Sequence, residues 1–167
     1  MQRKSALLGL VILAAVVLVS PVALAQTYTV LYSFPGTTGD GAYPQGITMD
    51  SAGNLYGFTL SGGLGFGTIY KLDPSGNESV LYAFTGQNDG SGPQGAPVLD
   101  AAGNIFGITA AGGSTLEGTV FKLDTSGTLK VIYNIDGQAR AGLTADAAGN
   151  LYGTTFFTRR FRPGKSL

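Results

Sequence analysis

The chain has 167 residues, no cysteine, no histidine and a formal net charge of zero. Without these two residue types it can form no disulfide, no Ser/His/Asp triad or Cys/His pair, and no histidine-based zinc or copper site. All ten acidic residues lie between Gln26 and Thr158, together with four basic ones, so this region is acidic and a poor partner for nucleic acid.

Residues 1–25 have the three-part pattern of a secretory signal peptide. Arg3 and Lys4 precede an uncharged apolar run, which is followed by Pro21 and the small residues of Ala23–Ala25. A membrane anchor is the alternative, but the run is shorter than the roughly 20 apolar residues that a span needs. We therefore expect cleavage after Ala25 and a secreted protein, either extracellular, at the cell surface or periplasmic.

The rest of the chain repeats with a period of about 50 residues. "VLYSF" at Val30 returns as "VLYAF" and "VIYNI", "GTIYKLDPSG" at Gly67 returns as "GTVFKLDTSG", and "DSAGNLYG" at Asp50 returns as "DAAGNIFG" and "DAAGNLYG". These marks divide the chain into repeat 1 (residues 26–77), repeat 2 (78–128), a partial repeat 3 (129–155) and an atypical basic tail (156–167).

Each repeat reads as four short strands. In the first they are Tyr28–Phe34, Gly46–Asp50, Asn54–Thr59 and Gly67–Asp73, which are rich in β-branched and aromatic residues and bounded by turn residues. No segment beyond the signal peptide has helical spacing. The sequence therefore predicts an all-β fold of tandem four-stranded antiparallel, blade-like sheets stacked face to face.

The phrase that begins at Asp50 has two interpretations. As a turn, Asp50 closes a strand and its carboxylate accepts backbone N–H groups, while Gly53 supplies a positive φ. As a site, its carboxylate and amide would bind calcium or sugar. A catalytic centre is needed once, whereas a turn is needed in every unit, so the repetition favours a structural turn. The same reasoning applies to "DPSGN" at 73–77.

The combination of "GNLYGFT", "GTIYKLDPSGN", "VLYAFTG" and "DGSGPQGAPVLDAAGN" resembles the GloVer tandem repeat. This is a β-propeller-type repeat of secreted bacterial proteins described as having a choice of anchor, and the resemblance extends from Tyr28 to Thr155. It implies four-stranded blades, export and surface display. It implies no reaction, because the family brings no catalytic residues to carry over.

Two features depart from a complete propeller. After Thr155 the expected glycine cluster is replaced by "FFTRRFRPGKSL", which favours a truncated or frame-shifted reading over a natural basic tail. Closed propellers need at least about four blades, and the chain supplies fewer than three units. We expect an incomplete propeller whose exposed outer sheets could self-associate.

The sequence predicts no catalytic residue, no metal site and no cofactor. "GQNDGSG" at 86–92 lacks the ligand alternation and terminal glutamate of a calcium loop, and "GLGFG" at 63–67 lacks the following helix of a nucleotide loop. Two functions remain: a non-catalytic secreted or surface repeat module with a binding or structural role, and an extracellular glycan-acting enzyme that uses loop carboxylates. The absence of histidine and cysteine favours the first.

Any partner is expected at one end of the sheets. In an antiparallel meander the tight "SAGN" and "PSGN" turns share one end, and the long, divergent loops share the other. Long loops on a rigid scaffold commonly carry binding. We therefore nominate Asp40, Tyr43, Asn88 and Asp89 as binding residues for an extracellular ligand, either glycan or protein, with Tyr43 as a stacking face.

Overall fold

The computed structural model describes residues 28–36, 39–139 and 141–156. All regular structure in this part of the chain is β-strand, which confirms the predicted fold class. The first sheet contains β1 (Gly41–Met49), β2 (Leu55–Gly62), β3 (Thr68–Leu72) and β4 (Glu78–Ala83). The second contains β5 (Ser91–Leu99), β6 (Ile105–Ala111), β7 (Thr119–Leu123) and β8 (Leu129–Asn134). The predicted signal peptide and almost all of the predicted basic tail lie outside the described residues.

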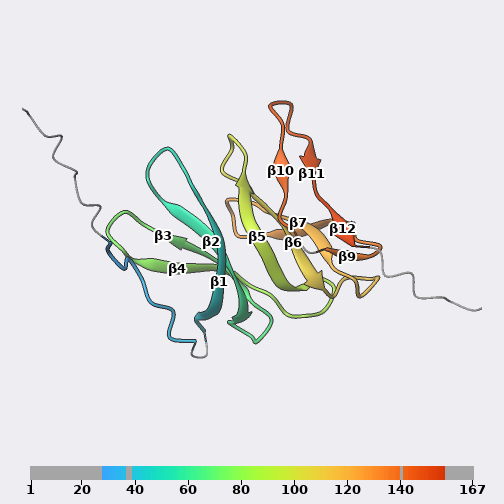
Figure 1. Ribbon diagram of the computed structural model, residues 1–167, viewed down its shortest axis with the longest axis horizontal. Coiled ribbons are helices and arrows are strands. Elements are labelled where there is room, and N and C mark those ends of the chain that lie inside the picture. The colour runs from blue at the N-terminus through green and yellow to red at the C-terminus, as the bar shows by residue number, and fades with distance from the viewer. Residues whose placement is uncertain (1–27, 37–38, 140, 157–167) are drawn as a thin grey trace, which may run out of the picture.

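Both sheets are antiparallel meanders in which each strand pairs with the next along the chain. The third unit is a hairpin interrupted midway. Its outer part pairs β9 (Gln138–Ala139) with β12 (Thr155–Phe156), and its tip pairs β10 (Thr144–Ala145) with β11 (Leu151–Tyr152). Figure 1 shows the two sheets and the hairpin following one another across the molecule, as the blade-like prediction requires.

The sheets begin one strand later than the repeat bounds drawn from the sequence. Residues 28–34, which we expected to be a strand, have no strand structure. The matching segment of the next repeat is β4, the last strand of the first sheet, where it pairs with β3. A strand requires a hydrogen-bonded neighbour, and residues 28–34 pair with no strand among the described residues. The structural units are therefore 41–83 and 91–134, whereas the bounds 26–77 and 78–128 each end between a third and a fourth strand.

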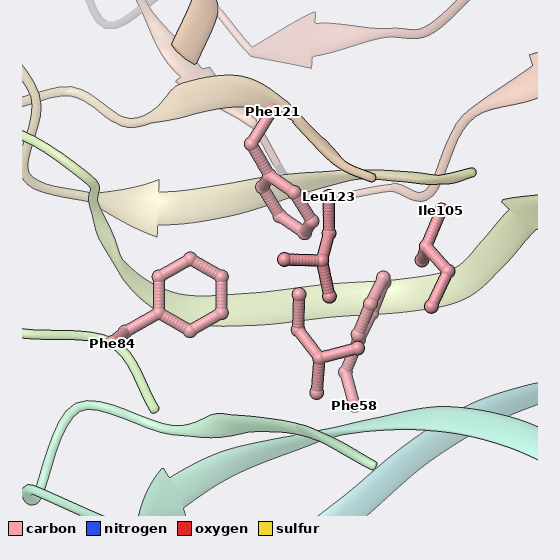
Figure 2. Close-up of a cluster of buried hydrophobic side chains, with 6 residues drawn as sticks. Phe58, Phe84, Ile105, Phe121 and Leu123 are labelled. Atoms are coloured by element: carbon pink, nitrogen blue, oxygen red, sulfur yellow. The ribbon is translucent and has the colours of Figure 1, made fainter. Parts of the chain in front are cut away.

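The main core lies between the first and second sheets. Side chains from both sheets are almost completely buried there, namely Phe58, Ile69, Phe84, Ile105, Phe121 and Leu123. The Phe121 ring centroid lies 5.6 Å from that of Phe58 and 5.2 Å from that of Phe84, both edge to face, which is a favourable arrangement for aromatic pairs. Figure 2 shows these side chains converging between the sheets.

The packing of this core requires a glycine at the last position of the repeated Asp phrase. A Cβ on Gly107 would lie 2.5 Å from Cζ of Phe58 and 2.6 Å from Cζ of Phe121. In the first sheet the ring of Tyr70 covers Gly57 in the same way. Gly107 is paired with Phe121 across the sheet, so the ring of Phe121 reaches over the strand that carries the glycine. No side chain can replace this hydrogen without displacing an aromatic ring.

Buried threonine pairs hold the opposite end of the central strands. The hydroxyls of Thr59 and Thr68 are 2.7 Å apart, and those of Thr109 and Thr119 are 3.0 Å apart. All four residues are fully buried. Their mutual hydrogen bonds satisfy polar groups that would otherwise destabilise the core, and they fix where the loops after β2 and β6 begin.

We predict that Gly107→Ala lowers the free energy of unfolding by about 1–3 kcal/mol, the usual cost of overpacking a filled core. Urea denaturation followed by tyrosine fluorescence measures the change. Ala111→Val is the control, because it enlarges an exposed position of the same strand and should change stability by less than about 0.5 kcal/mol. Equal stability of Gly107→Ala and the unmodified protein would show that the ring does not lie on this glycine.

Candidate functional site

The repeated Asp phrase forms a self-contained turn. Oδ1 of Asp50 accepts hydrogen bonds of 2.9 Å from the backbone N–H groups of both Ala52 and Asn54, and Oδ2 accepts one of 2.8 Å from the Asn54 side chain. Gly53 has a φ of 83°. Asp100 and Asp146 repeat these three bonds with their own neighbours. The structural interpretation of the phrase is confirmed.

The turns between third and fourth strands use the same chemistry. The Asp73 carboxylate accepts from the N–H groups of Ser75 and Asn77, and the Asp124 carboxylate from those of Ser126 and Thr128. Because strand direction alternates, all these turns lie at one end of the sheets. These carboxylates therefore accept hydrogen bonds from within their own turns.

The hydrogen bonds lower the pKa of these carboxyl groups. The side chain of Asn150, followed by its backbone N–H, lowers the pKa of Asp146 to about 2. The pKa of Asp50, Asp73 and Asp100 is lowered chiefly by the following asparagine, and that of Asp124 by the Ser126 hydroxyl. A general acid or base works best with a pKa near the operating pH, so none of these groups suits that role near neutrality.

We predict that the turn of the third unit weakens only at strongly acidic pH. The pKa of the Asp146 carboxyl is about 2 in the folded state and 3.8 when the group is unperturbed, so the stability that this carboxylate contributes is complete above pH 3.8 and is lost as the pH falls toward 2. Titration of its side-chain carboxyl by ¹³C NMR should give a midpoint near the lower value. Asp146→Asn provides the control, since its stability should depend less on pH in this window; a midpoint near 3.8 in the unmodified protein would contradict the turn geometry.

Two of the nominated residues hold loops in place. The Asp89 carboxylate accepts from the Thr85 N–H at 2.7 Å, the Thr85 hydroxyl at 2.6 Å, the Gln87 N–H at 3.2 Å and the Tyr82 hydroxyl at 3.1 Å. Burial and this carboxylate raise the pKa of Tyr82 to about 12. The Asp89 oxygens thus connect the loop after β4 to the strand before it.

Asp40 occupies the matching position one unit earlier. Its carboxylate accepts from the Tyr32 hydroxyl at 3.0 Å and from the Gly41 N–H at 2.6 Å. The pairs Tyr32 with Asp40 and Tyr82 with Asp89 are therefore repeats of one structural connection.

The other nominees are more exposed. Tyr43 is 71% exposed and has a φ of 58°, an uncommon conformation for a residue with a side chain. Asn88 lines an open hollow of about 390 Å³ beside Asp89, and neither Asp40 nor Tyr43 lines it. The structure thus brings Asn88 and Asp89 together and places the other two elsewhere. Binding by all four residues stays a prediction.

A different hollow arises where the first strands of successive units meet. β1 and β5 lie side by side, with the Thr48 hydroxyl donating to the Pro97 carbonyl at 2.5 Å and Gly46 facing Ala96 so closely that a Cβ would lie 3.0 Å away. Gly95 approaches the backbone of Gly142 in the third unit even more closely. Small residues therefore allow the first strands of the three units to lie close together.

Three glutamines line the hollow that results. Gln45, Gln94 and Gln138 come from β1, β5 and β9, and together with Gly95, Ala110 and Ala139 they surround about 600 Å³. The Gln45 amide donates to the Tyr43 carbonyl at 3.0 Å, which places the exposed tyrosine next to this site along the chain. The described residues that line the hollow carry no charge. They offer amide donors and acceptors.

Sequence reasoning missed this glutamine hollow. The only signal was the phrase "PQG" at 44–46 and 93–95, which we included in the long loops. The glutamines do not share one register, since Pro44 and Pro93 pair with Thr59 and Thr109 whereas Ala139, the residue after Gln138, pairs with Thr155. The convergence therefore depends on the packing between sheets, which a repeat alignment alone does not show.

Among residues 28–36, 39–139 and 141–156, no group of three or more acidic side chains is gathered as a metal would require. The same residues contain no helix of the length and apolarity needed to cross a bilayer.

Comparison with known proteins gives a family match and a distant structural likeness. A family model described as the Gloeobacter/Verrucomicrobia repeat matches residues 16–165. No curated protein matches the sequence significantly. Among solved structures, one described as a candidate gluconolactonase is similar with a TM-score of 0.48 and 18% sequence identity, over 74% of this chain and 44% of that one. The chain thus spans less than half of that structure's length.

Proposed function

The chain belongs to the Gloeobacter/Verrucomicrobia repeat family, and we propose that it is an exported, non-catalytic repeat module that binds a neutral glycan in the glutamine hollow. The observation that supports this is the meeting of Gln45, Gln94 and Gln138 in one hollow whose described lining residues carry no charge. Amide groups both donate and accept hydrogen bonds, which suits ligands rich in hydroxyl groups. The neighbouring Tyr43 offers an exposed aromatic face for a sugar ring.

The hydrogen bonding of the loop carboxylates supports a binding role over a catalytic one. Retaining and inverting glycosidases both need a pair of free carboxyl groups across the scissile bond. None of the described residues that line the glutamine hollow has a carboxyl group, and the Asp40 and Asp89 carboxylates hold loops. The alternative, an extracellular glycan-acting enzyme, would need one of these loop carboxylates to leave its hydrogen bonds.

We predict that Gln94→Ala weakens binding of a neutral oligosaccharide about tenfold, as expected for the loss of one or two well-placed hydrogen bonds. Cellohexaose and maltohexaose serve as probes, with binding followed by amide chemical shifts in NMR titrations. Gln87→Ala is the matched control, because this glutamine lies in the loop after β4 and does not line the hollow. Unchanged affinity in Gln94→Ala, or binding lost equally in Gln87→Ala, would refute the site.

The enzymatic alternative is tested with the same oligosaccharides. The proposal expects no release of reducing ends beyond the uncatalysed rate. Turnover that disappears in Asp89→Asn, in a variant with an unchanged unfolding midpoint, would establish the glycan-acting enzyme instead.

The proposed export predicts where the mature protein begins. If the amino-terminal segment is a signal peptide, the mature protein begins at Gln26, because cleavage follows the small residue Ala25. Intact-mass analysis of protein recovered from the secreted fraction checks this. A mass that includes Met1 would contradict cleavage and leave the glycan-binding proposal unaffected.

A further inference from the structure

A hollow of about 430 Å³ lies between the first and second sheets, at the end that carries the aspartate turns. We call it the turn hollow, and its volume is within the range of small-molecule sites. The first sheet contributes Tyr56 and Lys71 to its lining, and the second contributes Asp124 and the apolar Ile105 and Leu123. One basic and one acidic side chain from different sheets therefore line a single hollow.

The aspartate turn in this lining differs from the others in its hydrogen bonds. Four turns share an asparagine as their fifth residue, and its side-chain amide donates to Oδ2 of the first residue at 2.7–2.9 Å: those that begin at Asp50, Asp73, Asp100 and Asp146. In the turn at Asp124 the fifth residue is Thr128, whose hydroxyl pairs with that of Ser126 at 3.0 Å instead. All the hydrogen bonds that Asp124 accepts go to Oδ1, so its Oδ2 has no partner among the described residues. The oxygen that the other turns satisfy internally is thus available at the turn hollow.

Lys71 brings an ammonium group to the same hollow. It has no hydrogen bond and no ion pair among the described residues, and its Nζ lies 6.0 Å from the ring centroid of Tyr56. Asn77 chiefly, with a smaller contribution from the charge of Lys71, lowers the pKa of Asp73, which does not line the hollow. Since Lys71 and Asp124 form no ion pair with each other, two opposite charges line the hollow with space between them.

The apolar part of the lining belongs to the main core. Ile105 is 3% exposed and Leu123 is 2% exposed, and Leu81 packs against the same cluster. These side chains provide a fixed apolar surface beside the two charges. Ligand sites are commonly built in this way, with a mainly apolar lining and a few polar groups that orient the ligand. A ligand that matches the turn hollow therefore has an acidic group, a basic group and an apolar body.

We propose that the turn hollow binds a free α-amino acid with an apolar side chain. The carboxylate of the amino acid would accept from the Lys71 ammonium, and its own ammonium group would donate to Oδ2 of Asp124. Charge-assisted hydrogen bonds of this kind are among the stronger ones in proteins. A purely anionic ligand would be repelled by Asp124 and a purely cationic one by Lys71, which favours a zwitterion. The turn hollow shares no lining residue with the glutamine hollow, so this binding goes beyond the proposed glycan site.

The first test changes only the ligand. L-phenylalanine serves as the probe, and the amide chemical shifts of the full chain are followed in an NMR titration. We expect saturable shifts for residues 124–127. Two derivatives should bind at least tenfold more weakly: N-acetyl-L-phenylalanine, which lacks the ammonium group, and L-phenylalaninamide, which lacks the carboxylate. Glycine, which keeps both charges and lacks the apolar side chain, should also bind more weakly.

Two variants each remove one charge and keep the local packing. Lys71→Met retains the aliphatic stem of the lysine, and Asp124→Asn retains a side-chain oxygen that can accept the hydrogen bonds of the turn. Each should weaken binding of L-phenylalanine at least tenfold. Lys122→Met is the matched control and should bind normally, because Nζ of Lys122 lies 5.7 Å from the ring centroid of Phe106 in the second sheet and this lysine does not line the turn hollow.

Thr128→Asn tests the same oxygen by filling its free position. The variant restores the asparagine of the other four turns, and the new amide would donate to Oδ2 of Asp124. We expect binding of L-phenylalanine to weaken at least tenfold while the unfolding midpoint in urea stays the same or rises. Weaker binding in a variant of undiminished stability separates loss of the site from loss of the fold.

Several results would overturn the proposal. These are the absence of saturable L-phenylalanine binding, equal binding of either derivative, and unchanged affinity in Lys71→Met, Asp124→Asn or Thr128→Asn. Loss of L-phenylalanine binding in Gln94→Ala would also overturn it, because the ligand would then belong to the glutamine hollow. Oligosaccharide binding should be unchanged in Lys71→Met, so a failure of this proposal is distinguishable from a failure of the proposed glycan binding.

Discussion

The structure depends on one contact, an aromatic ring that lies on a glycine and against the preceding sheet. Phe121 covers Gly107 within its own sheet and packs on Phe58 and Phe84 of the first. Each sheet therefore supplies half of a core that neither can complete. In such an array, stability comes from the interfaces between neighbouring units as well as from the units themselves.

The ends of the strands are held by short polar connections that do not involve this core. Aspartate turns close one end of each sheet, and buried pairs such as Thr109 with Thr119 hold the other. Because both devices are satisfied locally, the loops beyond the threonine pairs can differ in length without disturbing the sheets. This explains why "LSGGLGF" and "AAGGSTLE" diverge while the aspartate turns barely change.

Local chemistry made the fold class and the turns predictable. Asp50, Gly53 and Asn54 make hydrogen bonds within a few residues, so their spacing was sufficient to identify the turn. The start of the structural unit was not predictable, because a periodic sequence can be divided at any strand. Whether "VLYSF" or "VLYAF" belongs to a sheet depends on the strand that pairs with it, and only the second has β3 beside it.

The candidate site was harder to predict than the fold for the same reason. Gln45, Gln94 and Gln138 are far apart in the chain and meet only because small residues let the first strands of three units approach. Conversely, Asp40 and Asp89 looked available in sequence, and their hydrogen bonds to tyrosines became evident only in three dimensions. Both the meeting of the glutamines and the hydrogen bonding of Asp40 and Asp89 depend on contacts between residues that local sequence patterns do not reveal.

The same logic explains why the two ends of the stack differ. Each of the two four-stranded sheets has one face centred on the ring over its glycine, Tyr70 over Gly57 or Phe121 over Gly107, and an opposite face toward the next unit. On the first sheet the face with the ring is covered by the amino-terminal segment, through Phe34 on Tyr70. On the second sheet the opposite face, with Ile108 and Ile135, meets a hairpin that contains Gly153, and no ring of the described residues lies over this glycine. The stack is therefore closed by its own chain at the first end, and at the other end the described residues leave an aromatic position open.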